Sequence, residues 1–185
     1  MQEHYEELAA EYDEHCVYGP DYVPWMASRI AEALRLGPTD RIADIGCGRG
    51  LFAREVVPLR HPILDVDPSE AMLSQLGAPP PVGLTPIVAS AEDVAEGRAQ
   101  LLYEQLDAMW LKESVHHVAD PAHTLHGLAD RLVPGGRLRV VMLPATIQYP
   151  LFEAALARFE ELQPDPAGIE RHLRAAGDRS QLCRT

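Results

Sequence analysis

Residues 42–50, which read IADIGCGRG, constrain the fold of this chain more than any other stretch. A short, mainly apolar run leads directly into Gly46, Gly48 and Gly50, three glycines at alternate positions. Glycine adopts backbone angles that other residues avoid, so this spacing predicts a buried strand that turns sharply into a helix. Backbone amides at such a turn approach a ligand closely. The pattern therefore predicts a ligand site where the strand ends or, if the glycines serve only the turn, a tight connection without a ligand.

The spacing of the glycines distinguishes between two kinds of nucleotide site. A dinucleotide-binding loop has the pattern G-x-G-x-x-G, which from Gly46 and Gly48 requires a third glycine at position 51. That position is Leu51, and no G-K-S or G-K-T sequence of a phosphate-binding loop follows. The loop therefore favours an adenosyl ligand without a pyrophosphate, and it disfavours a nicotinamide-dependent oxidoreductase.

Short apolar runs alternate with helical patterns along most of the chain. Strands are expected at residues 41–45, 62–66, 86–89, 106–111 and 136–143. Helices are expected at residues 2–15, 21–36, 50–57, 69–76, 92–103, 121–132, 150–162 and 167–176. This alternation predicts an α/β fold, a three-layer sandwich with a mostly parallel sheet and two extra helices at the N-terminus. The 185 residues suit one domain, with an N-terminal helical cap (1–37), a ligand-binding core (38–143) and C-terminal helices (144–185).

A carboxylate follows the second predicted strand. Asp67 lies about 20 residues after Gly46, where dinucleotide-binding folds place an acidic residue that accepts hydrogen bonds from a ribose diol. A second interpretation is local, because the sequence from Asp67 to Glu70 also forms a good capping box for a helix that begins at Pro68. The two roles are compatible, since the cap and the ribose-facing side of the carboxylate lie close together.

Charge and cysteine content disfavour several classes of function. The formal net charge is −12 at pH 7, which opposes binding to nucleic acid or to an anionic membrane surface. No apolar run approaches the roughly 18 residues of a transmembrane helix, and the acidic N-terminus lacks the pattern of a signal peptide. The three cysteines, Cys16, Cys47 and Cys183, are scattered and form no C-x-x-C pair. Their number and spacing favour a protein of the reducing cytoplasm, without a disulfide scaffold or a zinc site.

Five segments in order resemble the successive motifs of class I S-adenosylmethionine-dependent methyltransferases: DIGCGRG, LDVDPSEAML, VASAEDV, LDAMWLKESVHHV and LVPGGRLRVV. The resemblance covers about residues 40–143 and is greatest to the small-molecule branch that includes the ubiquinone and menaquinone biosynthesis methyltransferases. It implies a Rossmann-like sheet with strand order 3-2-1-4-5. It also implies the cofactor S-adenosyl-L-methionine, with S-adenosyl-L-homocysteine as the product.

The resemblance assigns cofactor contacts to individual positions. Gly46, Cys47 and Gly48 would contact the methionine end through the backbone, and Lys112 would border the same end. A lysine is unusual there, and its ammonium has three alternative partners: the cofactor carboxylate, the glutamate that follows it, or water. The full set of implied cofactor-binding residues is Tyr12, Asp44, Gly46, Cys47, Gly48, Asp67, Pro68, Ser90, Ala91, Glu92, Leu111 and Lys112.

At the adenosine end, the resemblance implies that Asp67 takes the ribose hydroxyls and that Pro68 lies beside the adenosine. Ala91 and Glu92 would lie at the edge of the adenine. Ser90 stands where the family usually has an aspartate, so the usual contact to the adenine amine would become a contact to a shorter hydroxyl.

Two adjacent histidines, His116 and His117, follow the fourth predicted strand. Adjacent residues of a helical turn point about 100° apart, so the two side chains cannot share one role. A neutral imidazole near pH 7 can take a proton from an acceptor that attacks a methyl group. Resemblance to branches whose first histidine faces the substrate makes His116 the preferred base and His117 the second candidate, unless both are structural. Metal ligation is not expected, because the H-x-x-x-H spacing is missing.

The implied activity is methyl transfer by in-line displacement to a small apolar or aromatic metabolite. The alternative is a cofactor-binding module or assembly subunit with weak or no turnover. Aromatic and apolar side chains from the two flanking regions are expected to cover the acceptor: Tyr5, Tyr12, Tyr18, Tyr22, Trp25, Ile147, Tyr149, Phe152, Leu156 and Phe159.

The C-terminal segment differs from the family pattern, which adds two antiparallel edge strands after the last helix. Only residues 178–185 follow Gly177, which leaves room for one short strand. An uncovered sheet edge pairs readily with another chain. We therefore expect either weak stability or a homodimer that buries this edge.

Overall fold

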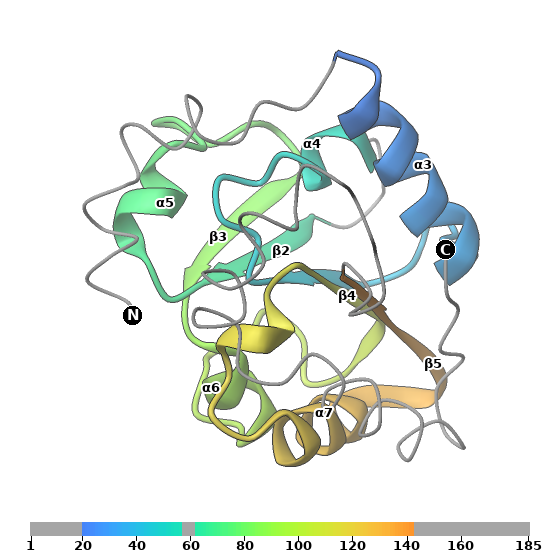
Figure 1. Cartoon of the computed structure of the whole chain (residues 1–185), viewed down its shortest axis with the longest axis vertical. Helices are drawn as coiled ribbons and strands as arrows, with labels where there is room; N and C mark the ends of the chain where they lie inside the picture. The colour runs from blue at the N-terminus through green and yellow to red at the C-terminus, as the bar shows by residue number, and fades with distance from the viewer. Residues whose placement is uncertain (1–19, 57–61, 143–185) are drawn as a thin grey trace, which may run out of the picture.

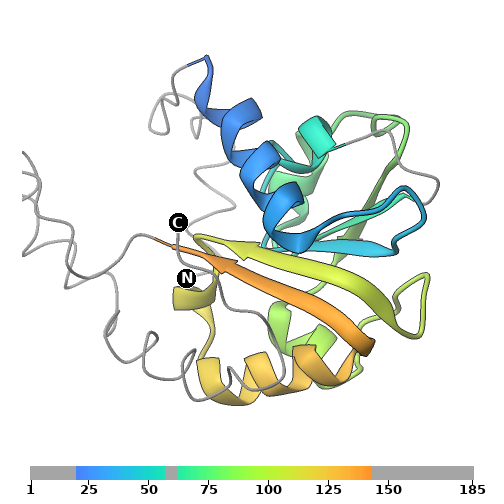
Figure 2. The same ribbon diagram turned by 90° about the vertical axis from the view of Figure 1, so that its right-hand side faces the viewer.

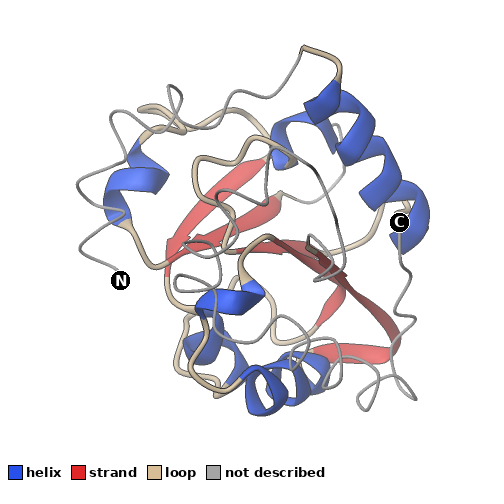
Figure 3. Cartoon of the chain, viewed as in Figure 1, coloured by secondary structure: helices blue, strands red, loops and turns tan. Residues whose placement is uncertain are grey.

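The computed structural model describes residues 20–56 and 62–142, and within them five strands form one sheet (Figure 3). The strand order is β3-β2-β1-β4-β5, and every pairing between these strands is parallel. The predicted fold class and strand order are thereby confirmed. The strands are β1 (Ile42–Ile45), β2 (Ile63–Asp67), β3 (Leu84–Val88), β4 (Leu106–Lys112) and β5 (Leu132–Val141).

Helices cover both faces of the sheet, which gives the three layers (Figures 1 and 2). One face packs against α3 (Tyr22–Leu34), α4 (Ala53–Val56) and α5 (Glu70–Ser74). The opposite face packs against α6 (Ala91–Ala95) and α7 (Pro121–Asp130). Between β4 and α7, residues Val115–His117 form the short 3-10 helix η1, which the sequence pattern did not predict.

The sheet is buried on both faces because its strands are apolar on both. In β1 all four residues are buried; Ala43 and Ile45 pack toward α6 and α7, whereas Ile42 packs toward α3. Trp110 of β4 is fully buried on the α3 side. Each fully buried aliphatic or aromatic side chain contributes roughly 1.5–3 kcal/mol, so the paired apolar faces account for the central position of this sheet.

Some element boundaries differ from those predicted. The helix expected at 92–103 ends at Ala95, because Gly97 takes a positive φ of 75° and Arg98 turns back to hydrogen-bond the Asp93 carbonyl. The last strand begins at Leu132 rather than at residue 136, and its register with β4 shifts near its start. The turn residues Pro134 to Gly136 therefore lie within the strand, at the register shift, rather than before it.

Several predictions fall outside the described residues. These include the helices at 2–15, 150–162 and 167–176, the strand room at 178–185, and the cofactor contact at Tyr12. The predicted acceptor-covering residues outside the described part are Tyr5, Tyr18, Ile147, Tyr149, Phe152, Leu156 and Phe159. Within the described part of the chain, no helix has both the length and the apolar character needed to cross a membrane. The homodimer that would bury the sheet edge stays a prediction.

Candidate functional site

A cavity of about 380 Å³ opens at the carboxyl ends of the strands. It lies at the end of β1, which has β2 on one side and β4 on the other. From β1 the chain adds β2 and β3 in one direction across the sheet, and then β4 and β5 in the opposite direction. Open α/β sheets bind their ligands at such a reversal, and the volume lies in the range of small-molecule sites. Of the residues assigned from the sequence, the cavity wall contains Asp44, Gly46, Cys47, Gly48, Asp67, Pro68, Ser90, Ala91, Glu92, Lys112 and His117.

The glycine loop after β1 is held against both neighbouring strands. The Gly46 amide donates to the Val66 carbonyl at 2.7 Å, and the Ser114 hydroxyl donates to the Ile45 carbonyl at 2.8 Å. Gly46 has a φ of 75°, and a Cβ there would lie 2.3 Å from the Ser114 Cβ. Only glycine fits between β2 and Ser114. At Gly48, with a φ of 57°, a Cβ would meet no atom within 4 Å, so this part of the backbone faces open space.

Asp67 joins the glycine loop to the start of α5. Its Oδ2 accepts a hydrogen bond from the Gly48 amide at 2.8 Å, and its Oδ1 accepts one from the Ser69 amide at 2.9 Å. The carboxylate is 8% exposed and lies on the cavity wall. Each carboxylate oxygen has two acceptor positions. The group is thus oriented by the backbone at the cavity wall, and a carboxylate is a group that accepts hydrogen bonds from a ligand diol.

The predicted capping role of Asp67 is wrong, because Ser69 is the N-cap of α5. The Ser69 hydroxyl accepts from the Met72 amide at 3.2 Å, and α5 begins at Glu70 rather than at Pro68. The β-region angles of Ser69, φ −92° and ψ 111°, are those of a capping residue. Asp67 is therefore not needed to cap the backbone amides of α5. Its place on the cavity wall remains as the observation that points to a ligand-binding role.

Two further carboxyl groups lie under the loop. Asp44 of β1 and Asp65 of β2 are paired in register, with exposures of 2% and 0%. Burial, and then the charge of Asp65, raise the pKa of Asp44 well above its usual range. Burial raises the pKa of Asp65 to about 7, and the nearby Thr85 backbone and Arg54 offset this only in part. Carboxyl groups whose pKa values are shifted far from the usual range are common at functional sites.

The start of α6 forms another part of the cavity wall. The Ser90 hydroxyl is the N-cap of this helix and accepts from the Asp93 amide at 3.1 Å, while the Asp93 carboxylate accepts from the Ser90 amide at 3.0 Å. Glu92 reaches the segment after η1, where its Oε1 accepts from the Ala119 amide at 3.1 Å. Glu92 thus links this wall to the chain that carries the two histidines.

The two histidines differ in their position relative to the cavity. His117 lies on the cavity wall, whereas His116 is 8% exposed and lies outside that wall. Their ring centroids are 4.0 Å apart. Burial lowers the pKa of His117, and burial followed by the charge of His117 lowers the pKa of His116 to about 4. Both imidazoles are therefore neutral at pH 7. Leu111, another predicted contact, is fully buried beneath the cavity and is not part of its wall.

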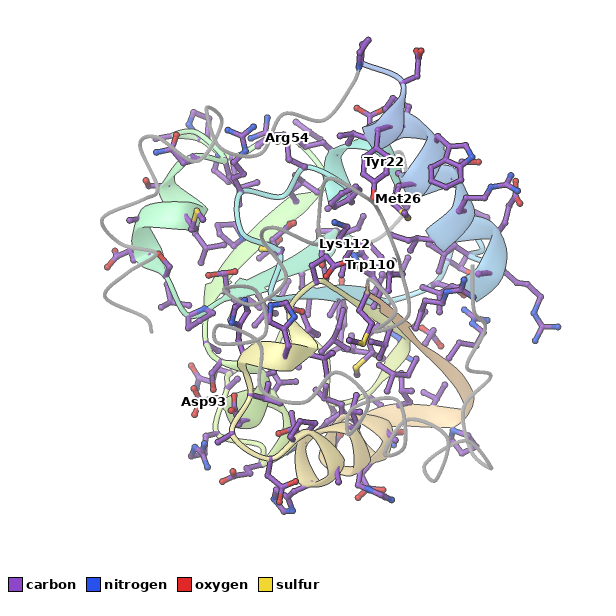
Figure 4. The ribbon with its side chains drawn as sticks, viewed as in Figure 1. Tyr22, Met26, Arg54, Asp93, Trp110 and Lys112 are labelled. Carbon is purple, nitrogen blue, oxygen red and sulfur yellow. The ribbon has the colours of Figure 1, made fainter. Side chains whose placement is uncertain are left out.

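Lys112 ends β4 at the edge of the cavity, on the side of α3. Its Nζ atom lies 5.2 Å from the centre of the Phe52 ring and 5.9 Å from the centre of the Tyr22 ring. Figure 4 shows Lys112 at the middle of the molecule, with Tyr22 of α3 nearby. Both distances are within the range of cation–π attraction.

Sequence reasoning missed part of the wall. Phe52 and Met72 contribute apolar surface, while Glu113 and Ser114 follow Lys112 directly. Phe52 and Met72 could have been predicted from the sequence, because each lies within about one helical turn of a segment already assigned to the site. Glu113 has a positive φ of 52°, a backbone conformation that no local sequence pattern predicts. The remaining missed residues of the wall are Arg49, Leu51 and Val118.

Comparison with known families agrees with this geometry. A family model described as a methyltransferase domain matches residues 43–140, which is more than half of the chain. The chain belongs to this methyltransferase family. The resemblance to class I S-adenosylmethionine-dependent methyltransferases seen in the motifs is thereby confirmed.

Individual relatives are similar in sequence. A ubiquinone biosynthesis O-methyltransferase of Rhizobium rhizogenes is 33% identical over 122 residues, which are 64% of this chain and 46% of the relative. One from Caulobacter is 34% identical over 124 residues, covering 64% and 45%. The chain thus spans about half the length of the curated relatives it matches.

Solved structures share the fold. A structure described as a DhpI-SAM-HEP complex superimposes with a TM-score of 0.60 at 21% identity, covering 83% of this chain and 68% of that one. The similarity supports the Rossmann-like arrangement of the methyltransferase sheet.

Proposed function

We propose that this methyltransferase binds S-adenosyl-L-methionine in the cavity and transfers its methyl group, by in-line displacement, to a hydroxyl of a small apolar or aromatic molecule. The observation that carries the proposal is the position of Asp67, a nearly buried carboxylate oriented by two backbone amides and still part of the cavity wall. The names of the O-methyltransferase relatives support a hydroxyl acceptor.

The wall residues suit the two ends of this cofactor. Asp67 accepts hydrogen bonds from the ribose hydroxyls, and the open backbone at Gly48 allows close approach. Pro68 and Ala91 provide surface beside the adenosine. When bound, S-adenosylmethionine supplies a methyl group on a positively charged sulfur. The chain supplies alignment and exclusion of water, which together account for up to roughly 7–11 kcal/mol in well-oriented reactions.

His117 is proposed as the residue that accepts the acceptor's proton. It faces the cavity, and burial keeps its pKa below the usual value, so the imidazole is neutral at pH 7. His116 lies behind it and outside the wall. This geometry favours the second of the two histidine candidates as the base.

The net charge of −12 supports a small-molecule acceptor rather than nucleic acid, and the cysteine pattern supports a cytoplasmic location.

Calorimetric titration with S-adenosylmethionine tests the proposal. Asp67→Ala should lower affinity about 10- to 100-fold, the usual effect of losing hydrogen bonds to a charged group. Asp130→Ala, at an exposed position of α7, is the matched control and should bind like the wild type. Unchanged affinity in Asp67→Ala, or no binding by the wild type, would contradict the proposal.

A methyl-transfer screen with phenolic and other hydroxyl acceptors tests turnover in the same proteins. His117→Asn should bind S-adenosylmethionine normally and turn over about 10²- to 10⁴-fold more slowly. A larger loss in His116→Asn would return the proton-accepting role to His116. Cofactor binding without turnover on any acceptor would favour the non-catalytic binding module instead.

A further inference from the structure

Asp65 is a buried carboxyl group that the proposed reaction does not use. It lies in the middle of β2, is 0% exposed and is not part of the cavity wall. A Cβ on Gly50 would lie only 3.2 Å from its Oδ1, so the end of the glycine loop covers the carboxyl group. Within the described residues, neither of its oxygens has a hydrogen-bond partner. Burial without partners favours the protonated form of a carboxyl group.

Asp44 lies beside Asp65 on the neighbouring strand. The two residues are paired in register between the parallel strands β1 and β2, and both share the face of Ile42 and Ile63, which pack toward α3. Neighbouring strands lie about 4.8 Å apart, so the two carboxyl groups are close neighbours. Asp44 is 2% exposed and, unlike Asp65, lines the cavity. A charge in the cavity therefore acts on Asp44 directly and on Asp65 through Asp44.

The groups around Asp65 compensate its charge only in part. Burial raises its pKa to about 7, while the Thr85 backbone of β3 and the charge of Arg54 on α4 lower it. The Arg54 guanidinium donates at 3.1 Å and 3.2 Å to two carbonyl groups that follow α5, and within the described residues it forms no ion pair with Asp65. Asp65 is therefore not held in its ionised form by a salt bridge.

The groups around Asp44 oppose one another. Burial, and then the charge of Asp65, raise the pKa of Asp44 well above its usual range. Other side chains near Asp44 come from both neighbouring strands and from the glycine loop: Trp110 and Lys112, which lower its pKa, Asp67, which raises it, and Cys47, whose thiol is neutral because burial raises its own pKa. Two carboxyl groups this close in a buried place do not readily ionise together, so at pH 7 the pair holds a proton.

We infer, building on the proposed function, that Asp65 is a positioning residue that shares a proton with Asp44, and that binding of the cationic cofactor expels this proton. S-Adenosylmethionine carries a net positive charge, which favours the ionised form of a carboxyl group on the cavity wall. The proton passes to solvent, and the pair changes from one negative charge to two. S-Adenosylhomocysteine has lost the sulfonium charge, so the pair keeps its proton when the product is bound. Preference for the cofactor over the product therefore increases with pH.

Calorimetric titration of the full chain in buffers of different ionisation enthalpy measures the protons released on binding. At pH 7, binding of S-adenosylmethionine should release a larger fraction of a proton from the wild type than from Asp65→Asn. Between pH 6 and pH 8, the ratio of the affinities for S-adenosylmethionine and S-adenosylhomocysteine should rise about 3- to 10-fold more in the wild type than in Asp65→Asn. The ammonium groups of the free ligands titrate alike in both experiments, so the comparison isolates Asp65.

Two further variants identify the source of the proton. Asp130→Asn makes the same chemical change at an exposed position of α7 and should match the wild type. His117→Asn should also keep the proton release, because burial leaves the His117 imidazole neutral before the cofactor binds. Release that disappears in His117→Asn, or that is equal in Asp65→Asn and the wild type, would overturn the inference.

Infrared difference spectroscopy tests the wild type without any substitution. Ordinary carboxyl groups are ionised at pH 7, so the C=O band of a protonated carboxyl group reports the buried pair. This band should weaken when S-adenosylmethionine binds and persist with S-adenosylhomocysteine, and ¹³C-labelling of the aspartates should shift it. Binding of both ligands with the same effect on the band, or with none, would overturn the inference alone. A protein that binds neither ligand would instead contradict the proposed function.

Discussion

The two faces of the sheet bury different kinds of side chain. Toward α6 and α7, the buried strand residues are all apolar, among them Leu64, Met109 and Val140. Toward α3, α4 and α5, the strands also bury polar and charged groups: Asp44, Asp65, Asp67 and Arg139 are each at most 8% exposed. Both faces belong to the same strands, since Asp44, Asp65 and Arg139 are each flanked by apolar residues of the other face.

This contrast indicates that the two faces do different work. Apolar burial stabilises the fold, whereas burying a carboxylate costs free energy unless it is paired or protonated. The sheet tolerates that cost on the α3 side, where Asp44 and Asp67 reach the cavity. Residues that oppose stability in this way are typical of functional sites. Substitutions on the α6 side should therefore change stability, and those on the α3 side should change binding or the pH dependence of stability.

The largest effect is expected from Leu128→Ala on α7, which is fully buried on the apolar face. Removing this side chain leaves a cavity and should lower the free energy of unfolding by about 2–5 kcal/mol. Urea unfolding measures the loss, and the protein that remains folded should bind S-adenosylmethionine with unchanged affinity. The control is Leu102→Ala, 59% exposed, with an expected change below about 0.5 kcal/mol. Weakened binding of S-adenosylmethionine by Leu128→Ala would contradict the expectation that substitutions on the α6 side change stability but not binding.

On the polar face, Asp65→Asn should give a smaller, pH-dependent effect of the opposite sign. The usual pKa of 3.8 applies to the unfolded chain, whereas burial raises the folded pKa to about 7. The folded state binds the proton of Asp65 more tightly than the unfolded state does. Protonation of Asp65 therefore stabilises the folded wild type fully below pH 3.8, and this stabilisation is lost as the pH rises through 7. The loss is on the order of a few kcal/mol, at about 1.4 kcal/mol per tenfold change in proton affinity.

Asparagine carries no such proton, so Asp65→Asn should be more stable than the wild type at pH 8, and the two should converge toward pH 4. Urea unfolding across this range is the measurement. The variant removes the charge of Asp65 from beside Asp44, but burial still raises the pKa of Asp44, so Asp44 keeps part of the slope. Arg54 of α4, whose charge opposes the rise in the pKa of Asp65, is present in both proteins. Parallel stability curves for variant and wild type would show that Asp65 does not titrate in this range.

The smallest effect is expected at Ser90, which caps α6 and also lies on the cavity wall. Ser90→Ala removes the cap and should lower the free energy of unfolding by about 1 kcal/mol. Its hydroxyl is already engaged with Asp93, so affinity for S-adenosylmethionine should stay unchanged. Ser28→Ala, on the exposed side of α3, is the stability control. Weakened binding in Ser90→Ala would mean that this hydroxyl also holds the adenine.

Local patterns were sufficient for much of the fold and for one end of the site. The glycines follow β1 and the carboxylate of Asp67 ends β2, two short strands that are mainly apolar, and parallel strands bring their carboxyl ends to one edge. Helix caps were harder, because Asp67 and Ser69 both have suitable side chains. The choice of Ser69 depends on the backbone conformation after β2, where Ser69 has the β-region angles of a capping residue.

The sequence by itself determined the order of strands and helices, the glycine turn and the acidic position that follows it, because these depend on residues close together in the chain. Only the tertiary structure decided that His117 and not His116 faces the cavity, and that Lys112 lies against Phe52 and Tyr22. Alternation along a strand tells which side chains share a face, but the helices packed on each face decide what those side chains meet. Those helices come from distant parts of the chain, so no local pattern says which partner or cavity a side chain reaches.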